Sequence, residues 1–215
     1  MLKQRWTKVL VFLLCLAPIF WLAWRAWHQN LTANPIEFIT RYTGDWTLRF
    51  IVFTLAVTPL RKLLALPDLI RFRRMIGLYA FFYGILHFTT YIWLDKFFDL
   101  ADMWKDIAKR PFITAGFAAF VTMLPLAITS TAGWIRRMGG KRWQQLHRLV
   151  YFSGIAGVTH YLWLVKSDIR LPVMYGVFVG VLLLYRVIVS LSKRKPAPAR
   201  SRVSSLSPGA LRDNP

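Results

Sequence analysis

Cysteine is nearly absent from this 215-residue chain, in which Cys15 is the single example. One thiol excludes an intramolecular disulfide, a four-cysteine iron–sulfur cluster and covalent cofactor attachment through a Cys-x-x-Cys-His motif. Acidic residues are also scarce, since nine Asp and Glu oppose 29 Lys and Arg. No acid lies deep in a hydrophobic run. We therefore expect neither a zinc site built from cysteine and carboxylate ligands nor the intramembrane acid relay of a proton-coupled transporter.

Hydrophobic residues make up 56% of the chain and gather in long blocks. The blocks approach the length of about 20 residues that a bilayer core demands, and they cover about 9–27, 46–64, 75–94, 112–130, 146–165 and 172–190. Backbone groups in lipid must pair internally, which predicts helices. The first block follows Lys3, Arg5 and Lys8 as a signal peptide would, but it runs into tryptophans without a small-residue cleavage site and is read as a retained span.

These blocks predict an all-α integral membrane protein, a six-transmembrane helical bundle formed by residues 1–192. The segment 193–215 is rich in Pro, Ser and Arg and poor in large hydrophobic residues. We expect it to be a disordered basic cytoplasmic tail.

The charges predict the orientation of the bundle. With six spans, 20 of the 29 basic residues fall on one side of the membrane, and seven of the nine acids fall on the other. The positive-inside rule then places both termini in the cytoplasm of a multi-pass protein. The net charge of +20 is explained by anionic lipid headgroups beside the spans, so membrane lipid is an expected partner and nucleic acid is not.

Three histidines, His87, His147 and His160, lie inside or at the ends of hydrophobic blocks. Polar side chains in hydrocarbon are costly, so the default interpretation is a functional site. Gly84 and Gly157 each precede a histidine by three residues. Aromatic residues follow at Phe88, Tyr91, Trp93, Tyr161 and Trp163. A missing side chain and surrounding ring faces suit a planar ligated group, which indicates haem.

Depth along the spans pairs two of these histidines. His87 lies about 18 Å into the third block and His160 about 21 Å into the fifth, at 1.5 Å per residue. Both blocks run outward, so the two imidazoles can face each other and ligate one non-covalent haem b. The alternative is a pair of hydrogen-bonded histidines that pack helices.

His147 lies near the cytoplasmic edge, 13 residues before His160, and could ligate a second haem. That spacing puts the two histidines off one helix face, so a distortion near Ser153-Gly154 would be needed. No matching histidine exists in the third block, where Arg73 and Arg74 stand instead. The alternative is a solvated histidine at a helix start. The fourth histidine, His28, is expected at the outer surface.

Two outer connections carry further expectations. Residues 28–45 are expected to form an outer loop with a helical patch at Glu37–Tyr42. Residues 95–110 mix acids, bases and aromatics with the spacing of a short amphipathic helix on the membrane surface. That helix is read as an interfacial anchor or, alternatively, as a docking surface for an outer partner.

Several motifs resemble one known family. They are Ala33-Asn-Pro35, Tyr42-Thr-Gly44, Thr58-Pro-Leu-Arg61, Arg73-Arg-Met-Ile-Gly77, Ile128-Thr-Ser-Thr131, Lys141-Arg-Trp-Gln-Gln-Leu-His147 and His160-Tyr-Leu-Trp163. They run from the first block to the sixth, and together they resemble the MsrQ (YedZ) family of the ferric-reductase-like transmembrane superfamily.

The resemblance implies a ferric-reductase-like bundle that carries electrons. His87 and His160 match the outer haem pair of the superfamily and His147 matches the inner ligand on the same span, so one haem b or two are implied, with FMN as an additional cofactor. Electrons would come from the quinone pool or a cytosolic flavin reductase. They would pass to MsrP, a periplasmic molybdopterin enzyme that reduces methionine sulfoxide in oxidised envelope proteins, across a bacterial inner membrane.

Other functions compete with this one. A stand-alone transmembrane ferric or oxygen reductase would need an open outer site, whereas ligation by two histidines saturates the iron. A cofactor-free helical scaffold or transporter is the third hypothesis. No Gly-rich dinucleotide motif follows the last block, so direct reduction by NAD(P)H is not expected. Whether the chain is itself an enzyme is left open, since the reduction of methionine sulfoxide would occur in the partner.

Overall fold

The computed structural model describes residues 5–192, so the predicted disordered tail, 193–215, lies outside the described residues. Within them the chain forms helices and no strands. The helices are α1 (Arg5–Trp27), α2 (Pro35–Leu63), α3 (Ile70–Thr90), α4 (Leu100–Lys109), α5 (Pro111–Ile128), α6 (Ala132–Met138), α7 (Gly140–Leu146), α8 (Leu149–Leu164) and α9 (Arg170–Ser192), with a 3-10 turn η1 (Pro67–Leu69) and a π-helical turn η2 (Tyr91–Asp95).

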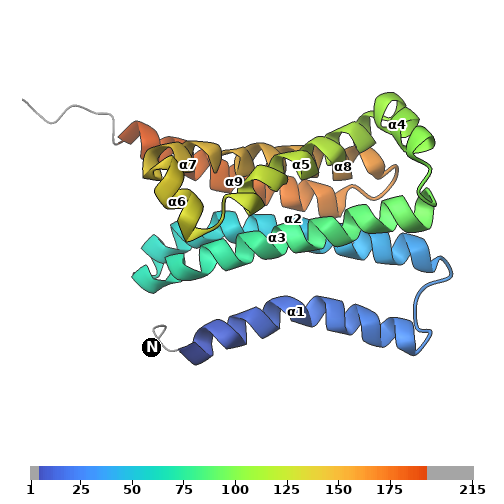
Figure 1. Ribbon diagram of the computed structural model, residues 1–215, viewed down its shortest axis with the longest axis horizontal. Helices are drawn as coiled ribbons and strands as arrows, with labels where there is room; N and C mark the ends of the chain where they lie inside the picture. Colours follow the sequence, from blue (N-terminus) through green and yellow to red (C-terminus); the bar gives the residue numbers. More distant parts are fainter. Residues whose placement is uncertain (1–4, 193–215) are drawn as a thin grey trace, which may run out of the picture.

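The long helices α1, α2, α3, α5, α8 and α9 run alternately up and down a bundle (Figure 1). The short helix α4 lies at one end, called the α4 end below. Helices α6 and α7 lie at the other, the α6–α7 end, where the described chain also begins and stops (Figure 1). Where the connection between two consecutive helices is short, the two helices pack antiparallel to each other.

Four stretches among residues 5–192 are long and apolar enough to cross a bilayer: Arg5–Trp27, Pro67–Asp95, Pro111–Ile128 and Arg170–Ser192. The all-helical membrane fold is therefore confirmed. Helix α2 carries charges through its first half, and α8 has only 16 residues. Both lie alongside the apolar helices, but the count of six spans stays a prediction.

Helix α2 begins eleven residues before the predicted block, so the expected outer loop over 28–45 is wrong from Pro35 onward, and the helical patch expected at Glu37–Tyr42 is part of α2. Asn34 caps the helix by accepting a hydrogen bond from the backbone N–H of Glu37 at 3.2 Å, and Pro35 occupies the first turn. A side-chain cap followed by proline starts a helix strongly. In consequence Asp45, expected in a loop, lies inside α2.

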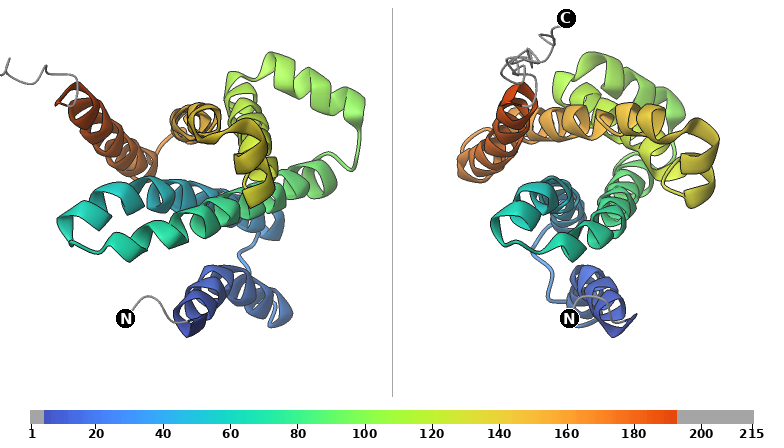
Figure 2. Two further views of the ribbon diagram at one scale, coloured as in Figure 1. Left: turned by 60° about the vertical axis from the view of Figure 1, so that its left-hand side comes forward. Right: turned by 90° about the vertical axis from the view of Figure 1, so that its left-hand side faces the viewer.

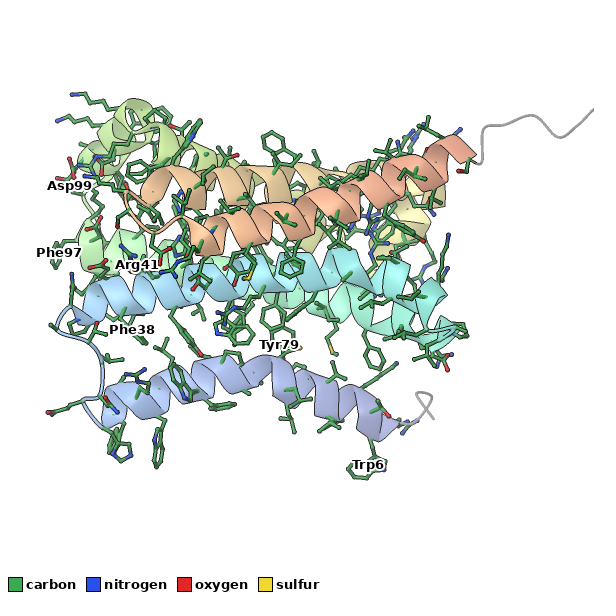
Figure 3. The ribbon with its side chains drawn as sticks, turned by 180° about the vertical axis from the view of Figure 1, so that it is seen from behind. Trp6, Phe38, Arg41, Tyr79, Phe97 and Asp99 are labelled. Atoms are coloured by element: carbon green, nitrogen blue, oxygen red, sulfur yellow. The ribbon has the colours of Figure 1, made fainter. Side chains whose placement is uncertain are left out.

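Helix α1 lies at the edge of the bundle (Figure 2) and is attached by tyrosine hydroxyls. The hydroxyl of Tyr79 donates to the carbonyl of Phe12, and that of Tyr83 to Cys15, each at 3.0 Å. Figure 3 shows Tyr79 between α1 and the rest of the bundle. The Tyr83 hydroxyl also accepts from the N–H of Ile19. It is thus inserted into the α1 hydrogen-bond ladder beside the internal Pro18.

Helix α4 confirms the amphipathic helix predicted within 95–110. Asp99 caps it, and Lys96 pairs with Asp102 at 2.7 Å and with the buried Asp106. The exposed residues of α4 include the apolar Leu100 and Trp104, which are 73% and 69% exposed. Such exposed apolar side chains suit the headgroup region of a bilayer.

The helix is interrupted at His147 and Arg148, which lie between α7 and α8. Helix α8 then continues through Ser153 and Gly154 without interruption, so the distortion that a second haem would have required near these residues is not found there. The physical reason is that α7 and α8 are separate helices, and the angular relation between His147 and His160 is set at the break.

Candidate functional site

Two imidazoles face each other in the interior of the bundle. The rings of His87 on α3 and His160 on α8 have centroids 6.0 Å apart and planes inclined at 70°. Neither helix contains an internal proline or a break. The pairing of these two histidines across the third and fifth hydrophobic blocks therefore follows from continuous helices.

A backbone carbonyl fixes each ring. Nδ1 of His87 lies 2.9 Å from the carbonyl oxygen of Thr40 on α2, and Nδ1 of His160 lies 2.6 Å from that of Phe112 on α5. A carbonyl oxygen can only accept, so each Nδ1 carries the proton and donates. Each Nε2 then keeps its lone pair, as in metal-binding histidines whose second nitrogen is held by a carbonyl.

A glycine stands four residues after each accepting carbonyl. Gly44 follows Thr40 on α2, and Gly116 follows Phe112 on α5. A Cβ added at Gly44 would lie 3.1 Å from the His87 ring, and one at Gly116 would lie 2.7 Å from Nδ1 of His160. Residues four apart stack on one helix face, so each glycine leaves open the space through which a ring reaches its carbonyl.

The rings border a cavity of about 590 Å³ that lies between α2, α3, α5 and α8. This volume falls within the range of about 300–1,000 Å³ usual for cofactor sites. Its inner wall is apolar, and Gly84 and Gly157, the glycines singled out in the sequence, both line it. Phe88, Tyr91 and Tyr161 line it as well, whereas Trp93 and Trp163 are more than half exposed elsewhere.

Charged residues lie towards the α4 end of the same cavity. Arg41, paired with Glu37 at 2.7 Å, lines it together with Asp45, Asp95 and Arg110. In Figure 3, Arg41 lies near that end, as do Phe97 and Asp99. The cavity thus joins an apolar interior to a polar mouth and fits a large planar group with an ionic edge.

The two imidazoles suit a single metal ion between them. Two metal–nitrogen bonds of about 2 Å and two ring radii of about 1.1 Å span about 6.2 Å, close to the observed 6.0 Å between the ring centroids. Among residues 5–192 no group of three His, Cys, Asp or Glu side chains could hold a metal. The remaining ligands of such an ion must therefore come from the bound group itself, as in a porphyrin.

His147 lies apart from this pair, at the α6–α7 end. Its ring stacks on Trp143 with centroids 3.8 Å apart, and its Nε2 lies 3.1 Å from the hydroxyl of Thr129. That hydroxyl donates its single proton to the carbonyl of Pro125 at 2.6 Å, so Nε2 of His147 is the donor. His147 therefore holds the opposite tautomer to His87 and His160.

Sequence reasoning missed Gly44 and Gly116. Gly44 belongs to the Tyr42-Thr-Gly44 motif, which by itself predicts no contact with a histidine. Nothing in the local pattern shows that either glycine faces an imidazole from another helix, and only the packing of α2 on α3 and of α5 on α8 reveals it.

Comparison with known proteins agrees with this architecture. The family model described as ferric reductase like transmembrane component matches residues 11–158. A protein of Herminiimonas arsenicoxydans, named protein-methionine-sulfoxide reductase heme-binding subunit MsrQ, is 53% identical over 94% of both chains. Proteins with the same name from Azospira oryzae and Caulobacter vibrioides are 50% and 51% identical, over 94% and 83% of this chain and 87% and 85% of their own.

No solved structure matches the chain. The family assignment rests on the sequence matches, which span the bundle from α1 to α9, and on the helical architecture that accompanies them. The chain belongs to the ferric-reductase-like transmembrane proteins and, within them, to the MsrQ family.

Proposed function

We propose that this chain is a transmembrane b-type cytochrome, the haem-binding subunit of a protein-methionine-sulfoxide reductase system. It carries electrons across a bacterial inner membrane to a periplasmic MsrP-type molybdoenzyme and so supports the repair of oxidised envelope proteins. The observation that carries the proposal is the facing pair His87 and His160, each with Nδ1 held by a carbonyl. The relatives described above are named as heme-binding subunits of a protein-methionine-sulfoxide reductase, which supports the haem-binding part of the proposal.

In this function His87 and His160 hold one haem b. Bound haem supplies one-electron transfer. The chain's residues place it, exclude water through the apolar inner wall, and set its potential through the two neutral imidazoles and the low dielectric around them. Arg41 and Arg110 lie at the cavity mouth, where their guanidinium groups suit the carboxylates of such a group.

The rest of the electron path belongs to the same proposal. The donor is the quinone pool or a cytosolic flavin reductase, with FMN as an additional cofactor. His147 is the proposed ligand of a second haem, which its Nε2 could join only after giving up its proton and its hydrogen bond to Thr129. The supporting observation is the charge distribution. Basic residues gather at the α6–α7 end, which suits a cytoplasmic face with both termini and six spans.

The test is haem quantitation followed by electron transfer. Purified full-length protein is assayed by pyridine haemochrome, with at least one haem expected per chain. It is then reduced in proteoliposomes by a quinol, or by NADH with a flavin reductase and FMN. Addition of MsrP and methionine sulfoxide should reoxidise it.

Two outcomes would contradict the proposal. A colourless protein, expressed with ample haem precursor, would remove the cytochrome assignment. Equally fast reoxidation by O2 or ferric iron without MsrP would favour the stand-alone reductase instead.

A further inference from the structure

Asp106 is the only charged residue that is buried among residues 5–192. It lies near the end of α4, and two cations contact its carboxylate. Nζ of Lys96 contacts Oδ2, and Nε of Arg110 lies 3.3 Å from Oδ1. A buried charge without such partners is strongly unfavourable, so Asp106 holds both cations at the α4 end.

The backbone of Arg110 is attached to Asp106 as well. The N–H of Arg110 donates to the carbonyl of Asp106 at 2.9 Å, and the carbonyl of Arg110 accepts from the N–H of Ile113 at 2.9 Å. Its backbone is extended, with φ −110° and ψ 101°, as is usual for a residue before a proline, here Pro111. Arg110 therefore has a defined place at the junction of α4 and α5.

The direction of the Arg110 side chain depends on Asp106. This side chain is 55% exposed, so packing restricts it little, and holding a long side chain in one conformation costs entropy. Arg110 nevertheless lines the His87–His160 cavity, whereas Asp106 does not. Asp106 thus contacts Arg110 from outside the cavity.

The second arginine at the cavity mouth is held differently. Arg41 also pairs with an acid four residues earlier, Glu37, but the two side chains are 57% and 49% exposed, and exposed ion pairs contribute little. Glu37 itself lines the cavity, where its charge repels another carboxylate. Arg110 is therefore better placed than Arg41 to bind an anionic group.

We propose that Asp106 is a positioning residue of the cofactor site, which holds Arg110 at the cavity mouth so that its guanidinium binds a carboxylate of the haem. The inference rests on the proposed function, in which haem occupies this cavity. The contact with Asp106 uses Nε, which leaves the N–H groups of Nη1 and Nη2 for the carboxylate. A guanidinium presents these donors in a planar fork that matches two carboxylate oxygens.

The same junction also orients the proposed iron ligand on α8. Phe112 follows Arg110 by two residues, and its carbonyl accepts from Nδ1 of His160 at 2.6 Å. Pro111, the first residue of α5, lies between them. One short segment therefore places both the cation at the mouth and the carbonyl that fixes the imidazole.

The test compares two cofactors that differ only at their carboxylates. These are haem and haem dimethyl ester, in which both carboxylates are methyl esters. Full-length apoprotein in detergent is titrated with each, and the ratio of the two dissociation constants is the carboxylate preference. The parent protein should prefer haem by about tenfold or more, the usual contribution of a hydrogen bond to a charged group.

Asp106→Asn and Arg110→Gln should each remove most of this preference, while the affinity for the ester stays that of the parent. Asp102→Asn is the matched control, because Asp102 lies on the same helix and pairs with the same lysine at 2.7 Å. No ion pair joins Asp102 to Arg110 within residues 5–192. Asp102→Asn should therefore keep the parent's preference.

The double variant Asp106→Asn/Arg110→Gln separates positioning from general stabilisation. If Asp106 acts through Arg110, its replacement changes the preference no further once the guanidinium is gone, so the two effects are not additive. A loss of fold stability alone would weaken the binding of both cofactors in every background.

Any of four results would overturn the inference: the parent binds haem and ester equally, Arg110→Gln keeps the full preference, Asp106→Asn weakens both cofactors equally, or Asp102→Asn lowers the preference as much as Asp106→Asn. If Asp106→Asn does not fold, the result for Arg110→Gln decides. A parent that binds both cofactors equally is still a haem protein, so the proposed function stands. A parent that binds neither removes the proposed function and this inference together.

Discussion

A methyl group placed on Gly116 would lie 2.7 Å from Nδ1 of His160, closer than any tolerated contact. The glycine sits one turn beyond Phe112, whose carbonyl accepts the hydrogen bond of that same nitrogen. The absent side chain on α5 therefore fixes the orientation of an imidazole on α8. Gly44 and His87 repeat this relationship on α2 and α3 with a wider clearance of 3.1 Å.

Gly116→Ala should accordingly lower haem affinity. The added Cβ pushes the His160 ring off its carbonyl, and loss of such an outer-shell partner costs about 10–100-fold in metal affinity. Titration of the apoprotein with haem measures it. Gly180→Ala is the control, because nothing lies within 4 Å of its Cβ position. Equal affinities in the two variants would show that the glycine does not position the ring.

Replacement of either facing histidine should abolish most of the haem absorbance. His87→Ala and His160→Ala each remove one of the two imidazoles that would hold the haem iron, and a single remaining ligand would hold the group poorly. Pyridine haemochrome per chain gives the readout. His28→Ala is the control, since His28 is exposed and its ring lies against that of Trp24 at a tilt of 59°. Full haem content in the His87 variant would contradict the assignment.

His147→Ala should remove at most one spectral component. Nε2 of His147 donates to the hydroxyl of Thr129 at the α6–α7 end. Because His147 lies apart from the His87–His160 pair, its loss should leave haem binding at that pair unchanged. Redox titration of the variant and the parent shows how many components each contains. One transition in both proteins would mean a single haem, and loss of all absorbance would mean that His147 supports the main site.

The contact between Lys96 and Asp102 should make the attachment of α4 pH-dependent. The ammonium group of Lys96, 2.7 Å away, holds the pKa of Asp102 below its ordinary value, near 3.9. The stabilisation is therefore complete above about pH 4 and is lost as the pH falls through the depressed pKa.

Hydrogen exchange over residues 96–110 tests this dependence. Asp102→Asn should exchange faster than the parent at pH 7, and the difference should vanish at low pH. A difference that stays constant from neutral to acid conditions would exclude the ion pair as its cause.

Tyr83→Phe should loosen α1. The buried hydroxyl replaces the helical bond between Ile19 and Cys15 beside Pro18, and its loss costs about 1–2 kcal/mol of unfolding free energy. Thermal unfolding in detergent measures the change. Tyr185→Phe serves as the control because its ring, not its hydroxyl, meets Lys62. Similar melting of all three proteins would mean that water can replace the Tyr83 hydroxyl.

Much of the bundle followed from periodicity and length alone. The predicted blocks at 112–130 and 172–190 became α5 (Pro111–Ile128) and α9 (Arg170–Ser192) within two residues at each end. Because charged residues lie at the ends of such apolar runs, the ends of these helices could be placed at few other positions. The start of α2 was wrong because the cap at Asn34 and Pro35 extends a helix through polar residues that hydropathy excludes.

The sequence by itself determined that this is a helical membrane protein with two histidines at one depth, because burial in lipid requires long apolar helices and helical rise sets depth. Only the tertiary structure decided which nitrogen of each histidine is free and which glycines admit the rings. Those relations join helices far apart in the chain, and no local pattern specifies how one helix face turns towards another.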